Sequence, residues 1–264
     1  MQDLHICLIQ SDLHWQDKTA NLAMFEEKIW QIDGPTDLIV LPEMFNTGFS
    51  MEAPALAEAM NLNTFKWMRQ MAAQTGAVLT GSYIVQENGY YFNRLIWMEP
   101  DGNYDHYDKR HLFRMAKEHE TFKGGDRKIV KDLKGWKIFP LICYDLRFPV
   151  WSRNVDLRYD VLLYVANWPE VRRSAWNILL AARAVENLCY TIGLNRVGED
   201  GKGISYAGDS TLVDYKGQIQ EYLGKEEGIL SLVLKKDGLE NYRAKFPAHL
   251  DADYFTLEER MESV

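Results

Sequence analysis

Short apolar segments recur along the chain. They comprise residues 4–9, 38–41, 78–85, 138–143, 161–166 and 191–194. Several are apolar at consecutive positions, as is typical of strands that are covered on both faces of a sheet. We therefore predict buried β-strands at these positions.

Three of the stretches between these segments show the periodicity of helices. One apolar stripe has helical spacing and consists of Leu22, Phe25, Ile29 and Ile32. A second repeat predicts a helix over residues 171–188 and consists of Val171, Ala175, Ile178, Leu179 and Ala182. A third helix is predicted over residues 65–73 and ends at Gly76. Strands that alternate with helices indicate a layered α/β fold.

The segment from residue 83 to residue 107 has a different pattern. Asn88-Gly89 and Asp101-Gly102 are turn signals between apolar, aromatic-rich runs, so we predict β-hairpins and a mixed sheet. No repeat, low-complexity stretch or Pro/Gly/Ser-rich linker divides the chain. We therefore expect a single domain over residues 1–264.

Composition narrows the class of protein. Of the 264 residues, 47% are hydrophobic and 26% charged, and 30 Lys and Arg against 38 Asp and Glu give a formal net charge of −8. This acidic balance favours neither a nucleic acid nor an anionic membrane as a partner. The longest apolar run, residues 161–166, is far shorter than the ~18 residues of a membrane span. The first ten residues do not predict a signal peptide.

The chain has three cysteines and no CxxC pair, which predicts a reducing, cytoplasmic environment. Cys143 follows a predicted strand and precedes a turn toward a helix near Pro149. A thiol there lies on rigid elements, near a helix N-terminus that favours the thiolate. A free cysteine is also often a small buried hydrophobe, and from the turn alone both interpretations stand. For Cys7 and Cys189 we favour packing.

Two charged residues also follow predicted strands. Glu43 comes after residues 38–42, where burial would raise the pKa of its carboxyl and make it a base near neutral pH. A solvated glutamate in a loop is the alternative. Lys109 lies in a charged run that, on spacing alone, indicates a solvated face.

Motifs for metals and nucleotides are missing. His106, His111 and His119 are not arranged as HExxH or HxH, and no GxGxxG, GxxxxGK[ST] or GxSxG occurs. We therefore expect neither a metal nor a cofactor.

Three segments resemble, in chain order, the Glu, Lys and Cys motifs of the nitrilase superfamily of carbon–nitrogen hydrolases. They are LPE at 41–43, KRHLF at 109–113 and CYDLRFP at 143–149. Further segments are similar to its amidase branch: NWP at 167–169, ARAVEN at 182–187 and NRVG at 195–198. The similarity extends from about Leu4 to Val233 and within the superfamily is greatest to the ω-amidases.

The resemblance implies a four-layer αββα sandwich with mixed sheets, and a homodimer. It implies hydrolysis, with water, of the terminal amide of a small oxo-dicarboxylic acid monoamide such as 2-oxoglutaramate or 2-oxosuccinamate. In that reaction Cys143 is the nucleophile that forms a thioester, Glu43 the general base, and Lys109 the stabiliser of the oxyanion. An amidase acting on deaminated glutathione or another small amide is the alternative, and a non-catalytic binding protein is a third hypothesis.

The resemblance also implies supporting residues. A second glutamate commonly follows the lysine in such amidases; here Glu118 is preferred and Glu120 remains open. The backbone N–H of Tyr144 is the expected second oxyanion donor. An anionic substrate calls for a cation, preferably a guanidinium. The candidates that lie beside the motifs are Arg147, Arg172 and Arg173, with Trp168 as an apolar wall.

Overall fold

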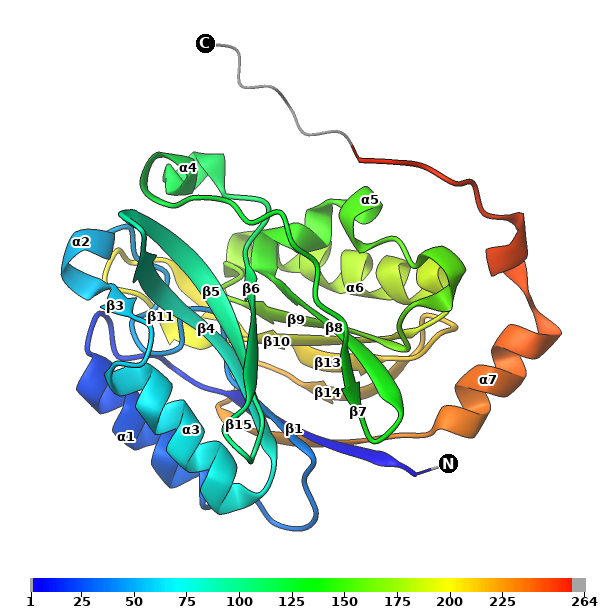
Figure 1. Ribbon diagram of the computed structural model, residues 1–264, viewed down its shortest axis with the longest axis horizontal. Coiled ribbons are helices and arrows are strands. Elements are labelled where there is room, and N and C mark those ends of the chain that lie inside the picture. The colour runs from blue at the N-terminus through cyan, green and yellow to red at the C-terminus, as the bar shows by residue number, and fades with distance from the viewer. Residues whose placement is uncertain (1, 258–264) are drawn as a thin grey trace.

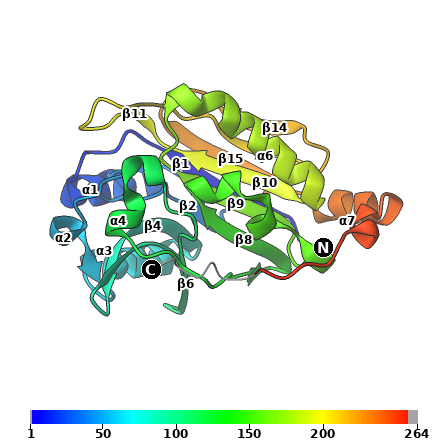
Figure 2. The same cartoon turned by 90° about the horizontal axis from the view of Figure 1, so that it is seen from above.

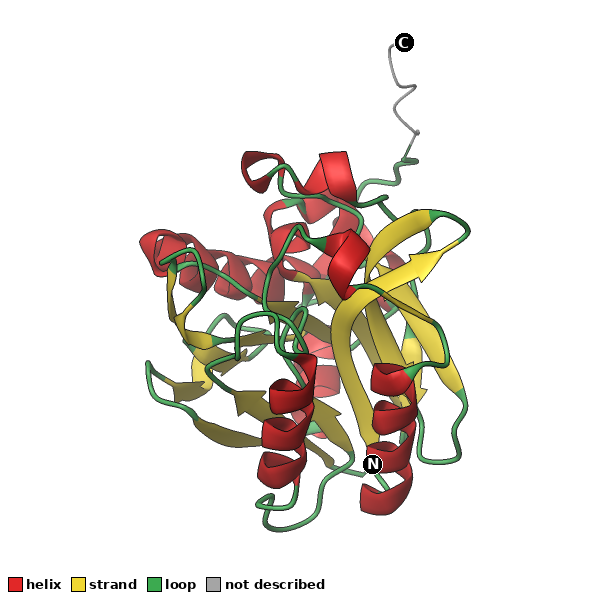
Figure 3. Cartoon of the chain, turned by 90° about the vertical axis from the view of Figure 1, so that its left-hand side faces the viewer, coloured by secondary structure: helices red, strands yellow, loops and turns green. Residues whose placement is uncertain are grey.

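Two β-sheets lie face to face in the computed structural model, which describes residues 2–257, and helices cover their outer sides (Figures 1 and 3). In the first sheet the strand order is β15-β1-β2-β4-β5-β6, and the short β3 pairs with β4. The bounds of these strands are β1 Leu4–Gln10, β2 Leu38–Val40, β3 Glu58–Ala59, β4 Val78–Glu87, β5 Tyr90–Met98, β6 Tyr104–Asp108 and β15 Gly228–Leu234. β1, β2 and β4 are mutually parallel, whereas β15, β5 and β6 pair antiparallel, so the sheet is mixed as predicted.

The second sheet has the order β14-β13-β10-β9-β8-β7. Its strands are β7 Lys131–Leu133, β8 Trp136–Ile142, β9 Val161–Ala166, β10 Tyr190–Asn195, β13 Ser210–Val213 and β14 Ile219–Leu223. The central β8, β9 and β10 run parallel, and their partners β7 and β13 run antiparallel. A separate two-stranded ribbon pairs β11 with β12, at Val197–Glu199 and Ser205–Ala207.

Helices α1 and α3 lie on one side of the paired sheets and α6 lies on the other (Figure 2). The α-helices are α1 Lys18–Ile29, α2 Ala53–Leu56, α3 Asn63–Thr75, α4 Glu118–Thr121, α5 Pro149–Ser152, α6 Arg173–Asn187 and α7 Lys236–Lys245. The 3₁₀ segments are Arg114–Ala116, Cys143–Arg147, Val155–Leu157, Glu170–Arg172 and Ala248–Asp251. As predicted, α3 ends at Gly76, whose φ of 68° gives the left-handed cap that glycine adopts without strain.

The principal core lies between the two sheets. Ile6 and Leu8 of β1 belong to the same buried cluster as Leu162 and Val165 of β9. A second cluster joins the outer face of the first sheet to α1 and α3, for example through Phe25. These layers form the predicted αββα sandwich. No helix within residues 2–257 is long and apolar enough to cross a membrane.

The predicted hairpins are confirmed. β4 and β5 are joined at Asn88 and Gly89, whose φ values of 51° and 80° suit the turn that connects two adjacent antiparallel strands. β5 and β6 pair antiparallel across the Asp101-Gly102 turn. The apolar segments chosen as strands also coincide with β1, β2, β4, β8, β9 and β10, except that Cys143 and Leu41 lie just beyond the strands they were assigned to.

The helix predicted over residues 171–188 differs from the observed one. A 3₁₀ turn precedes α6, which runs from Arg173 to Asn187. Two members of the apolar repeat face outward, since Val171 is 83% and Ile178 67% exposed. The helix instead packs through Trp176 and Leu180. Both approach Gly193 of β10 so closely that a Cβ there would lie 2.6 Å from each. The predicted repeat is therefore divided: Val171 and Ile178 are exposed, whereas Ala175 and Leu179 pack against the core between the sheets.

Candidate active site

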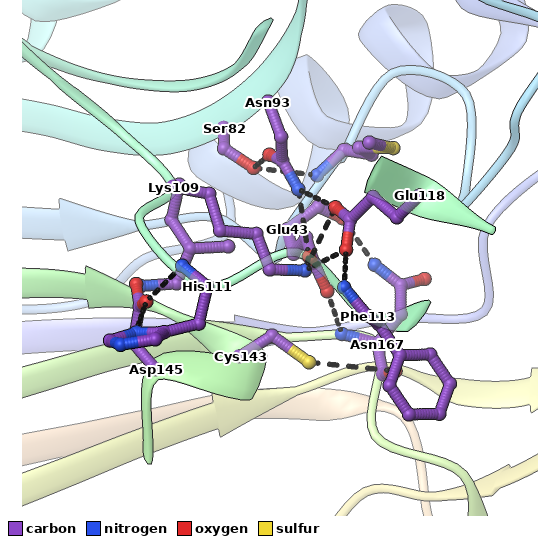
Figure 4. Close-up of polar contacts among 12 residues, drawn as sticks. Glu43, Ser82, Asn93, Lys109, His111, Phe113, Glu118, Cys143, Asp145 and Asn167 are labelled. Carbon is purple, nitrogen blue, oxygen red and sulfur yellow. Dashed lines mark hydrogen bonds and ion pairs between the residues drawn. The ribbon is translucent and has the colours of Figure 1, made fainter. Parts of the chain in front are cut away.

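Three side chains that follow buried strands meet where the two sheets lie against each other (Figure 4). Glu43 follows β2, Lys109 follows β6, and Cys143 follows β8. Glu43 and Lys109 are almost fully buried and Cys143 is 8% exposed. The topology of the sheets thus brings together three residues that are 66 and 34 positions apart along the chain.

Lys109 joins two carboxylates. Its Nζ donates to Glu43 Oε1 at 2.8 Å and to both oxygens of Glu118 at 3.0 Å. Burial alone would lower the pKa of Lys109, but the charges of Glu118 and Glu43 raise it above its ordinary value. The lysine is therefore a cation at any physiological pH. A lone buried charge is costly, so this pairing is a condition for placing an ammonium here.

Glu118 is the carboxylate that supports the lysine. Its Oε2 also accepts the backbone N–H of Phe113 at 2.6 Å. Burial raises the pKa of Glu118, while the charge of Lys109 opposes that shift. Glu120, the alternative, has a side chain that is 56% exposed and lies 3.7 Å from Lys117. The structure thus distinguishes two glutamates that the sequence left open.

Glu43 is held by groups from both sheets. Its Oε1 accepts Nδ2 of Asn93 at 2.8 Å, and its Oε2 accepts the backbone N–H of Asn167 at 2.8 Å. Asn93 is oriented in turn by Ser82, whose hydroxyl donates to Asn93 Oδ1 at 2.8 Å. These contacts fix the carboxylate in one orientation. The sequence analysis did not identify Asn93 and Ser82. Both are polar residues within buried strands, and that feature could have indicated a role in the site.

Cys143 lies on a sharp turn. Its φ of 43° is left-handed, a conformation that non-glycine residues adopt mainly where the surroundings enforce it. Burial raises the pKa of its thiol well above the ordinary value, the charge of Glu43 raises it further, and Lys109 opposes. This shift opposes the thiolate that a helix near Pro149 was expected to favour. Cys143 itself begins a 3₁₀ segment, and the helix after it, α5, is only one turn long. A neutral thiol needs a base before it can attack.

A pocket opens over Cys143 and Lys109. Predicted residues that line it are Tyr144, Arg147, Trp168 and Arg172. Arg173 is not among the lining residues. Its guanidinium instead pairs with the buried carboxylate of Asp209, with Nη2 2.8 Å from Oδ1, and also contacts the hydroxyl of Tyr222. The chain turns into α6 between Arg172 and Arg173, which accounts for their different surroundings.

The other two cysteines lie outside the pocket, whereas His111 contacts a carboxylate that joins two loops of the site. Cys7 and Cys189 are buried and unpaired, and neither lines the pocket. His111 Nδ1 lies 2.8 Å from Asp145. That carboxylate also accepts the N–H of Ile142, so it ties the loop of Lys109 to the turn of Cys143. Across residues 2–257 no group of three His, Cys, Asp or Glu side chains is arranged to hold a metal ion.

The comparisons with known proteins agree with this geometry. Residues 6–244 match the family model described as carbon-nitrogen hydrolase. The chain is 46% identical over 258 residues to omega-amidase YafV of Escherichia coli K12, covering 97% of this chain and 100% of that protein. It is 31% identical to a 2-oxoglutaramate amidase of Bacillus subtilis, covering 85% of this chain and 88% of that protein.

Solved structures extend the likeness. XC1258 of Xanthomonas campestris, a CN-hydrolase superfamily protein with an arsenic adduct in its active site, has a TM-score of 0.95 and 43% identity, covering 98% of this chain and 100% of that one. A mutant amidase of Nesterenkonia sp. AN1, with acrylamide added at the active-site cysteine, has a TM-score of 0.80 and 25% identity, covering 94% and 99%. The chain belongs to the carbon–nitrogen hydrolase family of the nitrilase superfamily and is an amidase-type enzyme.

Proposed function

We propose that this enzyme hydrolyses the terminal amide of a small 2-oxo dicarboxylic acid monoamide, 2-oxoglutaramate or 2-oxosuccinamate, to the acid and ammonia. The observation that carries the proposal is the contact of Lys109 Nζ with Glu43 and Glu118 in the pocket that Cys143 lines. The printed names of the relatives, an omega-amidase and a 2-oxoglutaramate amidase, support the choice of substrate.

In the first half of the reaction, Glu43 takes the proton of the Cys143 thiol as the sulfur attacks the amide carbon. A tetrahedral intermediate forms, with one C–S bond made and the carbonyl oxygen negative. Collapse of this intermediate breaks the C–N bond, and Glu43 returns the proton to the departing ammonia. The acyl group remains on Cys143 as a thioester.

In the second half, Glu43 takes a proton from water, and the oxygen attacks the thioester carbon. The C–S bond breaks, the proton returns to the sulfur, and the acid leaves. Lys109 and the backbone N–H of Tyr144 stabilise the oxyanion in both halves. Removing one such donor typically costs about 3–4 kcal/mol of barrier. Every proton and electron pair in this scheme is supplied by Cys143, Glu43, water and the substrate.

The thiol chemistry explains why the base must be close. The raised pKa of Cys143 leaves little thiolate at neutral pH, so proton transfer to Glu43 has to accompany attack. The N–H groups of Asn93 and Asn167 that donate to Glu43 hold its carboxylate in one orientation. Glu118 acts through Lys109 by holding its ammonium in place.

We further propose that the chain works as one domain, and as a homodimer in the cytoplasm. Three free, buried thiols suit a reducing compartment. Exposed apolar side chains on α6, Ile178 and Val185, and in the 3₁₀ turn before it, Val171, suit an interface between copies. An Ile178→Glu variant should then be monomeric by light scattering, with Glu240→Gln on α7 as a control. If the Ile178→Glu variant is still a dimer, this face is not the interface between the two copies.

The test of the function is ammonia release from 2-oxoglutaramate, glutamine, deaminated glutathione and a simple nitrile. We expect the wild type to prefer 2-oxoglutaramate and Cys143→Ala to be inactive, with Cys7→Ala as the matched control for loss of a buried thiol. Preference for deaminated glutathione would support the alternative amidase. Turnover that persists in Cys143→Ala would refute the mechanism, and release from none of the amides would refute the enzymatic proposal.

A further inference from the structure

The catalytic trio leaves three charged side chains of the pocket without a role. Arg147, Arg172 and Lys202 line its outer part, and none of them lies within 4.0 Å of a carboxylate oxygen of any described residue. Arg147 and Arg172 are partly exposed and Lys202 is exposed, whereas Lys109 below them is buried. Three cations without a carboxylate partner thus surround a single pocket.

The two guanidinium groups are held by aromatic rings. Arg147 lies over the ring of Trp168, with its Cζ 4.9 Å from the centroid, and Arg172 lies over Phe113 at 5.1 Å. Trp168 also donates its indole N–H to the carbonyl of Arg172 at 2.8 Å, which links the two supports. A guanidinium that stacks by its face keeps the N–H groups of its edge free for a carboxylate.

Lys202 reaches the pocket from the turn between β11 and β12. The turn is fixed by Asp200, whose Oδ1 accepts the backbone N–H groups of Lys202 at 2.9 Å and Ile204 at 3.0 Å. Its Oδ2 accepts the hydroxyl of Tyr206 at 2.9 Å. Asp200 is the one carboxylate that lines the pocket within the described residues, and its contacts hold the turn without neutralising a cation.

The pocket is therefore polarised along its depth. Its outer part carries three cations against one carboxylate. At its buried end Lys109 lines the pocket, and behind this ammonium lie the two buried carboxylates that contact it, Glu43 and Glu118. An anionic group is favoured outside and disfavoured inside, whereas a neutral amide group is tolerated at the buried end. This arrangement favours an anionic substrate over a cationic one, and it favours entry with the neutral amide end first.

We propose that Arg147, Arg172 and Lys202 form a cationic ring that binds the carboxylate of an anionic amide, directs its amide end toward Cys143, and discriminates against amides that carry an ammonium group. The inference rests on the proposed function of the same site and adds Lys202 as a specificity-determining residue. Glutamine and 2-oxoglutaramate have equal length and the same carboxylate and amide. They differ at one carbon, where glutamine carries an ammonium that the ring repels.

The test measures kcat/KM for 2-oxoglutaramate, glutamine and the neutral pentanamide in wild type, Lys202→Gln and Lys202→Glu. For Lys202→Gln we expect a loss of about two- to fivefold on 2-oxoglutaramate, through KM, as for one exposed charge pair. Lys202→Glu should lower kcat/KM for 2-oxoglutaramate further and should reduce the ratio of kcat/KM for 2-oxoglutaramate to that for glutamine. The kcat/KM for pentanamide, which carries no charge, should change least. Added salt should reduce the preference for 2-oxoglutaramate over glutamine, and this reduction should be larger in the wild type than in Lys202→Glu.

Lys245→Glu, at the exposed end of α7, is the matched control for charge reversal. Unchanged ratios among the three amides in Lys202→Glu, or equal changes in Lys245→Glu, would overturn the proposal.

A binding measurement separates this inference from the proposed function. The Kd for glutarate is compared between Cys143→Ala and the double variant Cys143→Ala/Lys202→Glu. We expect the double variant to bind glutarate at least about two- to fivefold more weakly, which is the effect of losing one exposed charge pair. If the wild type turns over none of the amides but this difference in glutarate affinity is found, the proposed function is refuted and the proposed cationic ring is supported. Equal glutarate affinity in the two proteins would refute the ring whatever the activity.

Discussion

The ammonium of Lys109 lies 2.8 Å from a carboxylate oxygen of Glu43, and both side chains are almost completely buried. Lys109 has a second carboxylate partner in Glu118, but it is the one cation within 4.0 Å of Glu43 among the described residues, and a buried carboxylate that loses its cation costs several kcal/mol. This pair joins the loop after β2 to the loop after β6. Catalysis and stability are therefore coupled at one contact.

Replacing Lys109 with methionine should impair both properties. Loss of an oxyanion donor predicts a fall in kcat of about 10²–10³. Two carboxylates left facing each other without a cation should also lower the free energy of unfolding by about 3–5 kcal/mol. Chemical denaturation and steady-state kinetics on one preparation measure both. Wild-type kcat in a folded Lys109→Met protein would contradict the assigned role.

The two glutamates of the α4 segment provide a matched pair of variants. Glu118→Gln removes a charge that holds Lys109, so we expect kcat to fall by about tenfold or more, as expected for loss of a charge-assisted contact. Glu120→Gln alters an exposed side chain and should leave kcat within about twofold, as surface substitutions usually do. Equal effects of the two substitutions would mean that the Lys109–Glu118 contact does not matter for turnover.

The raised pKa of the Cys143 thiol predicts its reactivity toward alkylating agents. With the thiol neutral near pH 7, iodoacetamide should modify Cys143 slowly in the free enzyme, and the rate should still be rising with pH above the ordinary thiol pKa of about 8.5. Mass spectrometry of the modified peptide over a pH series gives this profile. A rate that is already constant by pH 7 would indicate a thiolate and contradict the account.

Asp160 predicts acid sensitivity away from the active site. Burial would raise its pKa, but Lys236 and Arg243 of α7, together with the N–H of Lys137, lower it below the ordinary value. A lowered pKa contributes stability that is present above the unfolded value of about 3.9 and is lost as pH falls through the folded one.

We therefore expect Asp160→Asn to lower the free energy of unfolding at pH 7 by about 3–5 kcal/mol, in the range for breaking a buried pair. The difference from wild type should shrink as pH falls below about 4, where the carboxylate binds a proton in the unfolded chain while it is still ionised in the folded one. Denaturant titrations at pH 7 and pH 3.5 provide the comparison. A difference that is the same at both values would show that the charge of Asp160 is not involved.

Much of the fold was predictable because its signals are local. Consecutive apolar positions indicated β9, and the Asn88-Gly89 turn indicated the β4–β5 hairpin. The apolar repeat of α6 was only partly informative, because periodicity shows that one face is apolar but not which of its members are covered: Ile178 is exposed, whereas Leu179 packs against the core. Here Gly193 admits Trp176 and Leu180 on the other face, a packing relation between residues distant in sequence.

The site was predictable only in part. The resemblance of three motifs to one family singled out Glu43, Lys109 and Cys143, whereas the spacing around Lys109 alone indicated a solvated face. The groups that hold them do not follow from spacing: Asn93 contacts Glu43 across 50 positions, and Asn167 does so across 124. Arg172 and Arg173 are adjacent in sequence, yet one lines the pocket and the other pairs with Asp209. Such differences depend on where the chain turns into α6.

A thioester on Cys143 can be detected by the intact mass of the enzyme quenched in acid during turnover of 2-oxoglutaramate. We predict a transient increase in mass equal to the acyl group, which maps to the peptide containing Cys143 and is absent in Cys143→Ala. Complete turnover with no acyl adduct under any quench time, or an adduct on another residue, would contradict it.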